Sequence, residues 1–197
     1  MSFNNKQLYK LTFILFVALL ITSCVTETIE SPAMRFSDAA VISVQDPNII
    51  VMQGSTIAWL PEAVRFYKDE RLQSEAVKSL LEEEITKNIL AKEMILVDSV
   101  NGASYAIAYT AALESSLDDA AVIRRFGLLP GNSQVPKNDA TIEKGNLIVY
   151  VFENKTGEIV WRSAAQIGVK FDASDAERKQ RIERVLAEMF QAFSVTK

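Results

Sequence analysis

The sequence predicts an α+β fold, with one mixed or mainly antiparallel sheet and two main amphipathic helices in a single domain. Short segments rich in β-branched and aromatic residues recur between turn residues, as expected for strands. Two longer segments, 69–92 and 174–193, place apolar residues at steps of three and four, which indicates amphipathic helices. A short turn between 145–152 and 158–166 favours an antiparallel hairpin.

The first half of the domain contains three short strands and one long helix. Ala40–Val44 and Ser55–Leu60 are rich in residues that favour strands. The helix over Asp69–Lys92 has the apolar stripe Leu72, Ala76, Val77, Leu80, Leu81, Ile85 and Ile89. Met94–Val97 is a short strand of the buried type. We therefore expect this helix to pack on a sheet.

The middle of the chain alternates more clearly. In the strand Ser104–Ala112, Tyr105, Ile107 and Tyr109 point to one side, and small residues point to the other. Leu117–Phe126 is a short helix, and the Pro- and Gly-containing segment Gly127–Asp139 is an exposed loop.

The last part of the domain is the hairpin followed by the second main helix. The strand Gly145–Phe152 is apolar on both faces, and Glu158–Gln166 is its partner. Such a strand is either central and covered on both sides, or keeps one face for a partner molecule. The helix Ser174–Phe193 begins at a capping residue, Ser174 or Asp175.

The N-terminal segment has the pattern of a secretory leader. Two lysines precede the uncharged apolar run Leu11–Ile21, which is too short to cross a bilayer. The run ends in Ile21-Thr22-Ser23-Cys24, which resembles the bacterial lipobox. The resemblance implies cleavage between Ser23 and Cys24 and a lipid on the Cys24 thiol. The alternatives are a free thiol behind an ordinary leader, or an anchor that is not cleaved.

These features divide the chain into a lipoprotein signal peptide (1–23), a lipidated N-terminus with a flexible tether (24–35) and an α+β domain (36–197). The alternative for the tether is an edge strand docked to the sheet. The residue after Cys24 is Val25 and not Asp. This resembles the pattern of lipoproteins that are sorted to the outer membrane in a host with two membranes. We expect the protein to be anchored at the periplasmic face of that membrane.

The residue inventory excludes several kinds of site. The chain has no histidine, and Cys24 is its only cysteine, so a Ser-His-Asp triad, a Cys-His pair, a Cys/His zinc site and a disulfide are excluded. The net charge of −4 becomes −6 when the leader and its two lysines are removed, and no basic cluster is present, which excludes nucleic-acid binding. We expect no catalytic residue, no metal and no cofactor other than the covalent lipid on Cys24.

Four residues are candidates for a binding surface. Trp161 and Arg162 are of the types that dominate interface hot spots; alternatively, Trp161 anchors the core and Arg162 faces water. Tyr105 and Tyr109 are candidates for stacking on sugars; alternatively, they form half-buried sheet surface.

Acidic and nucleophilic residues suggest weaker sites. Glu82–Glu84 and Asp118–Asp119 are candidates for a cation site or an acid–base pair, but consecutive acids on a helix point in different directions, which favours a solvated face. No pattern in the sequence pairs Ser163 with a lysine.

Three segments together resemble a known family. They are Thr56–Leu60, the hairpin Lys144–Phe152 with Lys155–Arg162, and the terminal helix ending at Phe193. With the lipobox, they resemble the domain of unknown function 4136 family of bacterial envelope lipoproteins, most specifically in the Lys-Thr-Gly-Glu turn and the Val-Trp-Arg strand. The resemblance implies an α+β lipoprotein domain in the envelope and no established reaction or ligand.

The leading functional hypothesis is a non-enzymatic, lipid-anchored domain that binds another envelope protein through the apolar hairpin. The second is a module that binds a small ligand or cell-wall glycan through Tyr105, Tyr109 and the loop Gly127–Asp139. The third is a carboxylate-dependent hydrolase, which requires two acids in one pocket. In each case the membrane is a partner through the lipid anchor.

Overall fold

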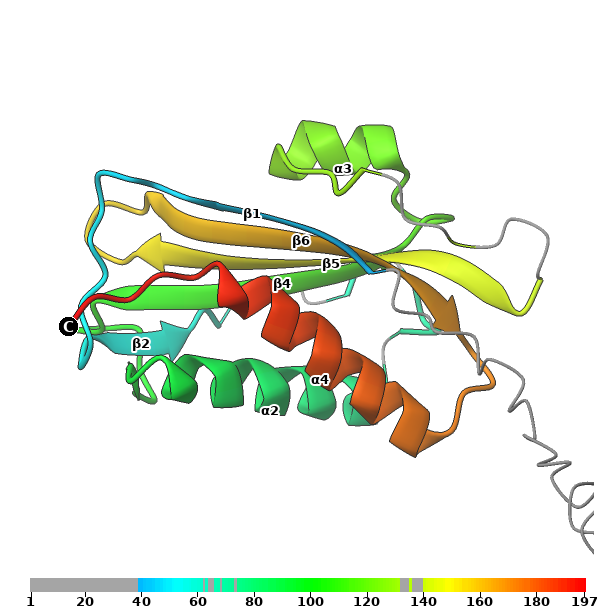
Figure 1. The fold of residues 1–197 in the computed structure, drawn as a ribbon, viewed down its shortest axis with the longest axis horizontal. Coiled ribbons are helices and arrows are strands. Elements are labelled where there is room, and N and C mark those ends of the chain that lie inside the picture. The colour runs from blue at the N-terminus through cyan, green and yellow to red at the C-terminus, as the bar shows by residue number, and fades with distance from the viewer. Residues whose placement is uncertain are drawn as a thin grey trace, which may run out of the picture. The chain divides into compact units, whose positions relative to one another are not determined.

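A six-stranded mixed sheet forms the centre of the domain, with the strand order β1-β6-β5-β4-β2-β3 (Figure 1). The computed structural model describes residues 39–61, 63, 66, 67, 69–72, 74–131, 135 and 140–197. The strands are β1 (Ala40–Gln45), β2 (Thr56–Trp59), β3 (Ile95–Leu96), β4 (Tyr105–Leu113), β5 (Ile142–Glu153) and β6 (Ile159–Lys170). The strands from β1 to β4 in this order pair antiparallel, whereas β2 pairs parallel to both β4 and β3.

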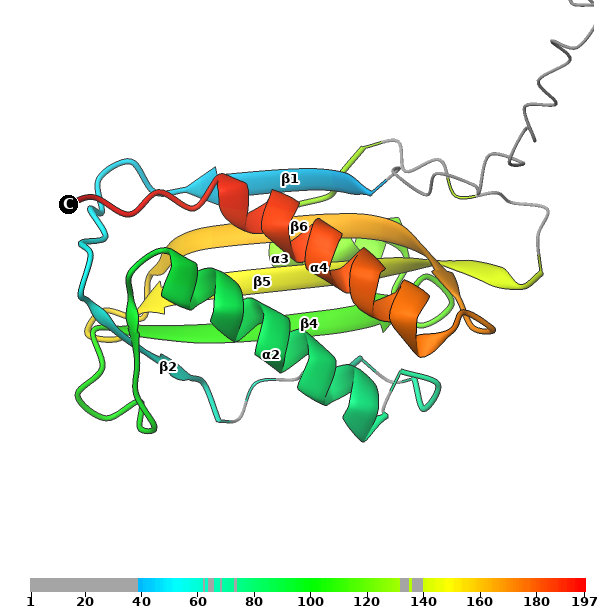
Figure 2. The ribbon, with the colours of Figure 1, turned by 60° about the horizontal axis from the view of Figure 1, so that its bottom comes forward.

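Helices cover both faces of this sheet. Figures 1 and 2 show α2 (Glu75–Ala91) and α4 (Asp175–Gln191) on one face and the short α3 (Asp119–Phe126) on the other. The predicted fold class is confirmed, including the hairpin and the two main helices. The capping prediction at Ser174 is also confirmed, because Ser174 and Glu177 form a capping box at the start of α4.

Several predicted boundaries differ from the structure, among them the starts of one helix and one strand. The helix predicted from Asp69 begins at Glu75, because the Ser74 hydroxyl accepts a hydrogen bond from the Val77 N–H at 3.2 Å and caps it there. The strand predicted from Gly145 begins at Ile142, because it continues to pair with the end of β6 as far as Lys170.

The main core lies between the sheet and the helices α2 and α4. Trp161 of β6 is fully buried there, and its ring packs against Phe190 and Phe193 at centroid distances of 4.9 and 5.0 Å. Tyr105 and Tyr109 of β4 point to the same face and belong to the same core cluster.

The opposite face of the hairpin is also covered. Ile148, Tyr150 and Ala164 are buried in a second cluster with Leu128, against which Phe126 of α3 packs. The hairpin is therefore central in the sheet and does not keep an open apolar face, so one of the two alternatives for Gly145–Phe152 is wrong. The burial of Leu128 also corrects the expectation that the loop is exposed from its start; residues 132–134 and 136–139 lie outside the described residues.

The domain contains its own complete core. Phe36–Lys197 forms one compact unit, and the three core clusters consist of residues between Ala39 and Val195. Within the described ranges, no helix has both the length and the apolarity needed to cross a membrane. The predicted leader and tether, with Ser23 and Cys24, lie outside these ranges.

Candidate functional site

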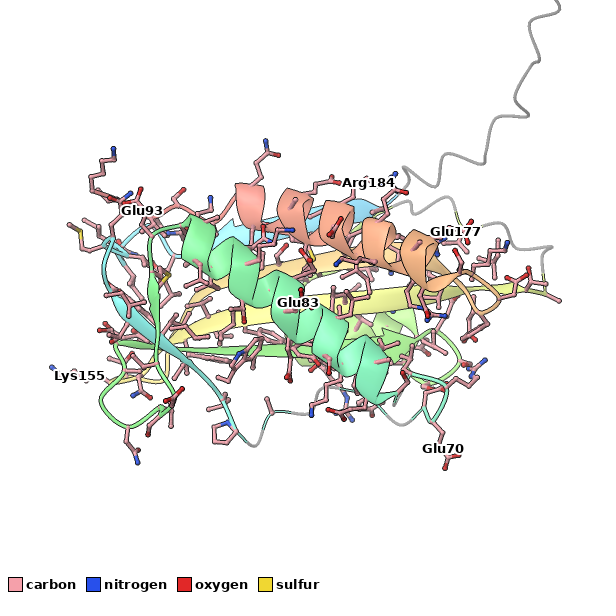
Figure 3. The ribbon with its side chains drawn as sticks, turned by 90° about the horizontal axis from the view of Figure 1, so that it is seen from below. Glu70, Glu83, Glu93, Lys155, Glu177 and Arg184 are labelled. Atoms are coloured by element: carbon pink, nitrogen blue, oxygen red, sulfur yellow. The ribbon has the colours of Figure 1, made fainter. Side chains whose placement is uncertain are left out.

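An apolar pocket of about 210 Å³ lies between α2, α4 and the sheet. It is at the end of the domain where both helices begin. The two helices run in the same direction and diverge toward their N-termini, as Figure 3 shows from the helix side. The walls are mainly aliphatic: Leu72, Val77, Leu81, Leu113, Leu147, Ile167, Val169, Ile182 and Val185.

Small residues leave the room for this pocket. Its floor includes Ala111 and Ala112 of β4 and Gly145 of β5, which carry little or no side chain toward the helices. A Cβ atom at Gly145 would lie 2.5 Å from Cγ2 of Val169, so only glycine fits beneath that wall residue. The side chains of α2 and α4 that line the pocket do not fill the volume above these small residues.

The rim of the pocket is cationic. Four basic side chains contribute to the lining, and we refer to Arg71, Lys170, Arg178 and Arg181 as the cationic rim. No acidic residue is among the described residues that line the pocket. The arrangement therefore combines aliphatic walls with positive charge.

Arg71 closes one side of the rim by bridging two segments. Its guanidinium lies 5.0 Å from the ring centroid of Phe171, a cation–π contact between two lining residues. Asp69 accepts hydrogen bonds from Nε and Nη2 at 3.0 and 2.7 Å, and Nη1 lies 2.9 Å from a Glu143 oxygen. The charge of Arg71 is thus already compensated, and this residue holds the segment before α2 against β5.

This ion pair predicts an acid-sensitive component of stability. The hydrogen bond from Arg71 outweighs burial and lowers the pKa of Asp69 from 3.8 to about 2. A lowered folded-state pKa stabilises the fold above pH 3.8, and this stabilisation is lost as the pH falls through about 2. We expect Asp69→Asn to reduce the free energy of unfolding at pH 7 by about 1–2 kcal/mol and to flatten its pH dependence between pH 4 and 2.

Urea denaturation of the domain at several pH values measures both effects. Asp98→Asn, at an exposed turn residue, is the matched control and is expected to change neither. Equal stability of the two variants at pH 7 would contradict the role given to Asp69.

The two arginines of α4 come from adjacent turns of its first half. Nη1 of Arg178 lies 2.8 Å from Asp175, and Nη1 of Arg181 donates to the Gly168 carbonyl at 2.9 Å. Burial lowers the pKa of Arg181; Glu177 opposes this, and Arg184 and Arg178 add to it. Burial and the two neighbouring arginines therefore disfavour the charged form of the Arg181 side chain.

The predicted surface residues do not form a surface in the structure. Trp161 and Tyr109 are fully buried, and Tyr105 is 7% exposed. The interpretation of these three side chains as an exposed binding patch is therefore wrong, because β4 and β6 are covered by α2 and α4 on that face. The alternative of a core position describes Trp161, and the tyrosines are buried more deeply than either interpretation expects.

Arg162 lies on the other face of β6 from Trp161. Its Nη1 donates to the Phe126 carbonyl at 3.0 Å, and the backbone at Gly127 lies close against the same guanidinium. Strand alternation thus separates Trp161 from Arg162, and Arg162 fastens the end of α3 to the sheet instead of facing water.

The acidic candidates have structural partners. Glu84 is buried and pairs with Lys87 at 3.1 Å, which corrects the expectation of a fully solvated face, whereas Glu83 is exposed (Figure 3). Asp118 caps α3, and Asp119 accepts from Lys144 at 2.8 Å. In the described part of the chain, no group of three or more acidic, histidine or cysteine residues is placed to hold a metal.

Ser163 is also accounted for by the core, since its hydroxyl hydrogen-bonds with that of Ser43 at 2.7 Å and not with a lysine.

Sequence reasoning did not identify Arg178 and Arg181. The usable signal was their spacing, because 178, 181, 182 and 185 recur at steps of one, three and four and lie on one side of a helix. The two arginines therefore continue the apolar stripe that begins at Ile182, instead of lying opposite to it. No local pattern in the sequence indicated that a pocket would form at this place.

Several solved structures resemble this domain at low identity. A DUF4136 family protein from Bacteroides thetaiotaomicron is 14% identical, with 81% of this chain and 98% of that chain covered and a TM-score of 0.50. The PelC dodecamer from Paraburkholderia phytofirmans is 9% identical over 77% and 97% of the two chains, with a TM-score of 0.43. A lipoprotein from Neisseria meningitidis is 6% identical over 70% and 98%, with a TM-score of 0.39.

No curated protein sequence matches this chain. The sequence model of one family, described as a domain of unknown function (DUF4136), does match it, and the match extends over residues 42–193. This range runs from β1 through both main helices to Phe193 and includes the hairpin that carried the resemblance. The protein belongs to the DUF4136 family.

Proposed function

We propose that the protein is a lipid-anchored, non-enzymatic envelope protein whose domain binds an apolar group in the pocket between α2, α4 and the sheet. The observation that carries this proposal is the lining of the pocket. Its walls are aliphatic, and its described lining residues include neither an acid nor a cysteine or histidine. Such a lining favours binding of an apolar molecule and offers no acid–base pair for chemistry.

The size of the pocket limits the ligand. Its volume of about 210 Å³ exceeds that of an engineered apolar cavity of about 150 Å³ that binds benzene. It is smaller than the roughly 300–1,000 Å³ typical of pockets for drug-sized molecules. The pocket therefore suits one hydrocarbon chain or one ring and not a bulky glycan.

The proposal revises the two binding hypotheses from the sequence. A partner protein on the outer face of the hairpin has no open surface there, because Leu128 and Phe126 cover it. A glycan stacked on Tyr105 and Tyr109 has no access to these buried rings. The ligand hypothesis remains, at a different site. A hydrolase has no support in the pocket, because the described lining contains no acidic residue.

The location in the envelope rests on the N-terminal sequence. The leader and the lipobox support export and lipidation at Cys24, and Val25 supports sorting to the outer membrane. The tether of 24–35 then keeps the domain within reach of the membrane, whose lipids are a source of apolar ligands.

Binding of the neutral fluorescent probe N-phenyl-1-naphthylamine to the purified domain, residues 36–197, tests the proposal. We expect saturable binding that Val77→Phe weakens at least tenfold, because the larger side chain occupies the pocket. Val44→Phe is the matched control, since Val44 is 43% exposed and lies on β1, outside the pocket. Circular dichroism verifies that both variants fold. Absence of saturable binding, or equal binding by the two folded variants, would reject the proposal.

A further inference from the structure

The cationic rim limits the chemistry of the ligand. Its four basic side chains face one pocket, and their acidic partners are outside the described lining. Arg71 precedes α2 and Lys170 ends β6, whereas Arg178 and Arg181 belong to α4. A neutral hydrocarbon would bury the walls but would make no favourable electrostatic contact with the positive charge of the rim.

Arg71 is not available for a ligand. It pairs with Asp69 and Glu143 at distances of 2.7 and 2.9 Å, and its guanidinium makes a cation–π contact with Phe171. Breaking these contacts would leave the nearly buried carboxylate of Asp69 without its cationic partner, which is costly. Arg71 therefore forms a fixed edge of the rim.

Arg178 is held more weakly. Its Nη2 donates one long hydrogen bond to the Ala173 carbonyl at 3.3 Å. Its acidic partner Asp175 is 98% exposed, and an exposed ion pair of this kind stabilises by at most about 1 kcal/mol. A carboxylate that arrives from the pocket side can replace Asp175 at the guanidinium at little cost. The guanidinium fork matches a carboxylate in two parallel hydrogen bonds.

Arg181 lies deeper and next to a like charge. Burial disfavours its charged form, and the repulsion from Arg184 and Arg178 adds to this effect. An anion between Arg178 and Arg181 would offset both the desolvation and the repulsion. The N-termini of α2 and α4 also lie at this end of the pocket, and the helix dipoles add positive potential there.

We propose that the ligand is a single fatty-acyl chain that ends in a carboxylate, with the hydrocarbon between the aliphatic walls and the carboxylate at Arg178 and Arg181. This inference rests on the proposed function, because it assigns a ligand class to the same pocket. One chain agrees with the volume of about 210 Å³, which leaves no room for the second chain of a membrane phospholipid. Ile182 and Val185 continue the stripe of Arg178 and Arg181 along α4 and place the apolar walls next to the charged end.

Competition against the neutral naphthylamine probe tests the inference at pH 7.5, where decanoate carries its charge and decanol has none. We expect decanoate to displace the probe about ten times more effectively than decanol from the unmodified domain. Arg181→Met and Arg178→Met are each expected to reduce this preference at least fivefold while probe binding is retained. Methionine keeps part of the aliphatic stem and removes the charge.

Lys179→Met is the matched control, because Lys179 is an exposed cation of the same helix and is not part of the described lining. It is expected to change the preference less than twofold. Equal displacement by decanoate and decanol, or a preference that all three variants leave unchanged, would overturn the inference while the apolar pocket stands. If neither the probe nor decanol binds saturably, the proposed function fails as well. A preference for decyl phosphate over decanoate would reject the carboxylate as the head group.

Discussion

Replacing Trp161 with alanine is expected to reduce the free energy of unfolding by about 3–5 kcal/mol, the range for large aromatic side chains removed from a packed core. Trp161 is fully buried, and its ring lies against Phe190 and Phe193 at the end of α4. Its removal leaves a cavity between the hairpin and the helix that carries the cationic rim. Since typical domains are stable by only about 5–15 kcal/mol, we expect a large loss of folded protein at 37 °C.

Urea denaturation of the domain measures this effect, and two variants define its cause. Trp161→Phe is expected to cost less than half as much, because the indole N–H has no hydrogen-bond partner among the described residues and only packing is lost. Trp59→Ala removes the other tryptophan, which is partly exposed and packs edge-on against Tyr109 at 6.0 Å. Its cost is expected to be about 1–3 kcal/mol. Equal destabilisation at the two tryptophans would contradict the central place given to Trp161.

Replacing Cys24 with serine is expected to abolish lipid attachment, because serine lacks the thiol that the lipobox pattern presents for acylation. The full chain, expressed in a bacterial host with two membranes, is then expected to lose incorporation of a palmitate analogue completely. It is also expected to keep its leader, which gives a larger species on a denaturing gel. Both changes are visible in one labelling experiment.

Val25→Asp is the control for this variant. It retains Cys24, so we expect normal labelling and normal size, together with a shift from the outer-membrane fraction to the inner-membrane fraction on a density gradient. Undiminished labelling of Cys24→Ser would contradict lipidation at this residue. Unchanged fractionation of Val25→Asp would contradict the sorting expectation alone.

The fold followed closely from local patterns in the sequence. The spacing of apolar residues distinguished the helices α2 and α4 from the strands, and the turn at Glu153–Gly157 predicted the hairpin of β5 and β6. These features depend on neighbours within one element, which a single sequence displays. The error at the start of α2 arose although its cap, Ser74, is local, because the apolar spacing continues before the capping residue. The error at the start of β5 arose because its pairing partner lies in β6.

The functional residues were predicted less well, because burial depends on what covers a strand. The sequence shows that Trp161 and Arg162 point to opposite faces of β6, but not that α4 covers one face and that Phe126 and Leu128 cover the other. Tyr105 and Tyr109 were chosen for their chemistry, and their position beneath the helix layer excluded them.

The residue inventory and the periodicity of the chain are sufficient to establish the α+β class, the absence of histidine, and a single cysteine in a lipobox-like segment. These are properties of composition and of near neighbours. The pocket depends on contacts between distant segments: Gly145 of β5 meets Val169 of β6, and the segment before α2 and the helix α4 bring Arg71 and Arg181 to one rim. Because an unfilled volume is defined by the side chains around it, it exists only after the sheet and both helices have packed.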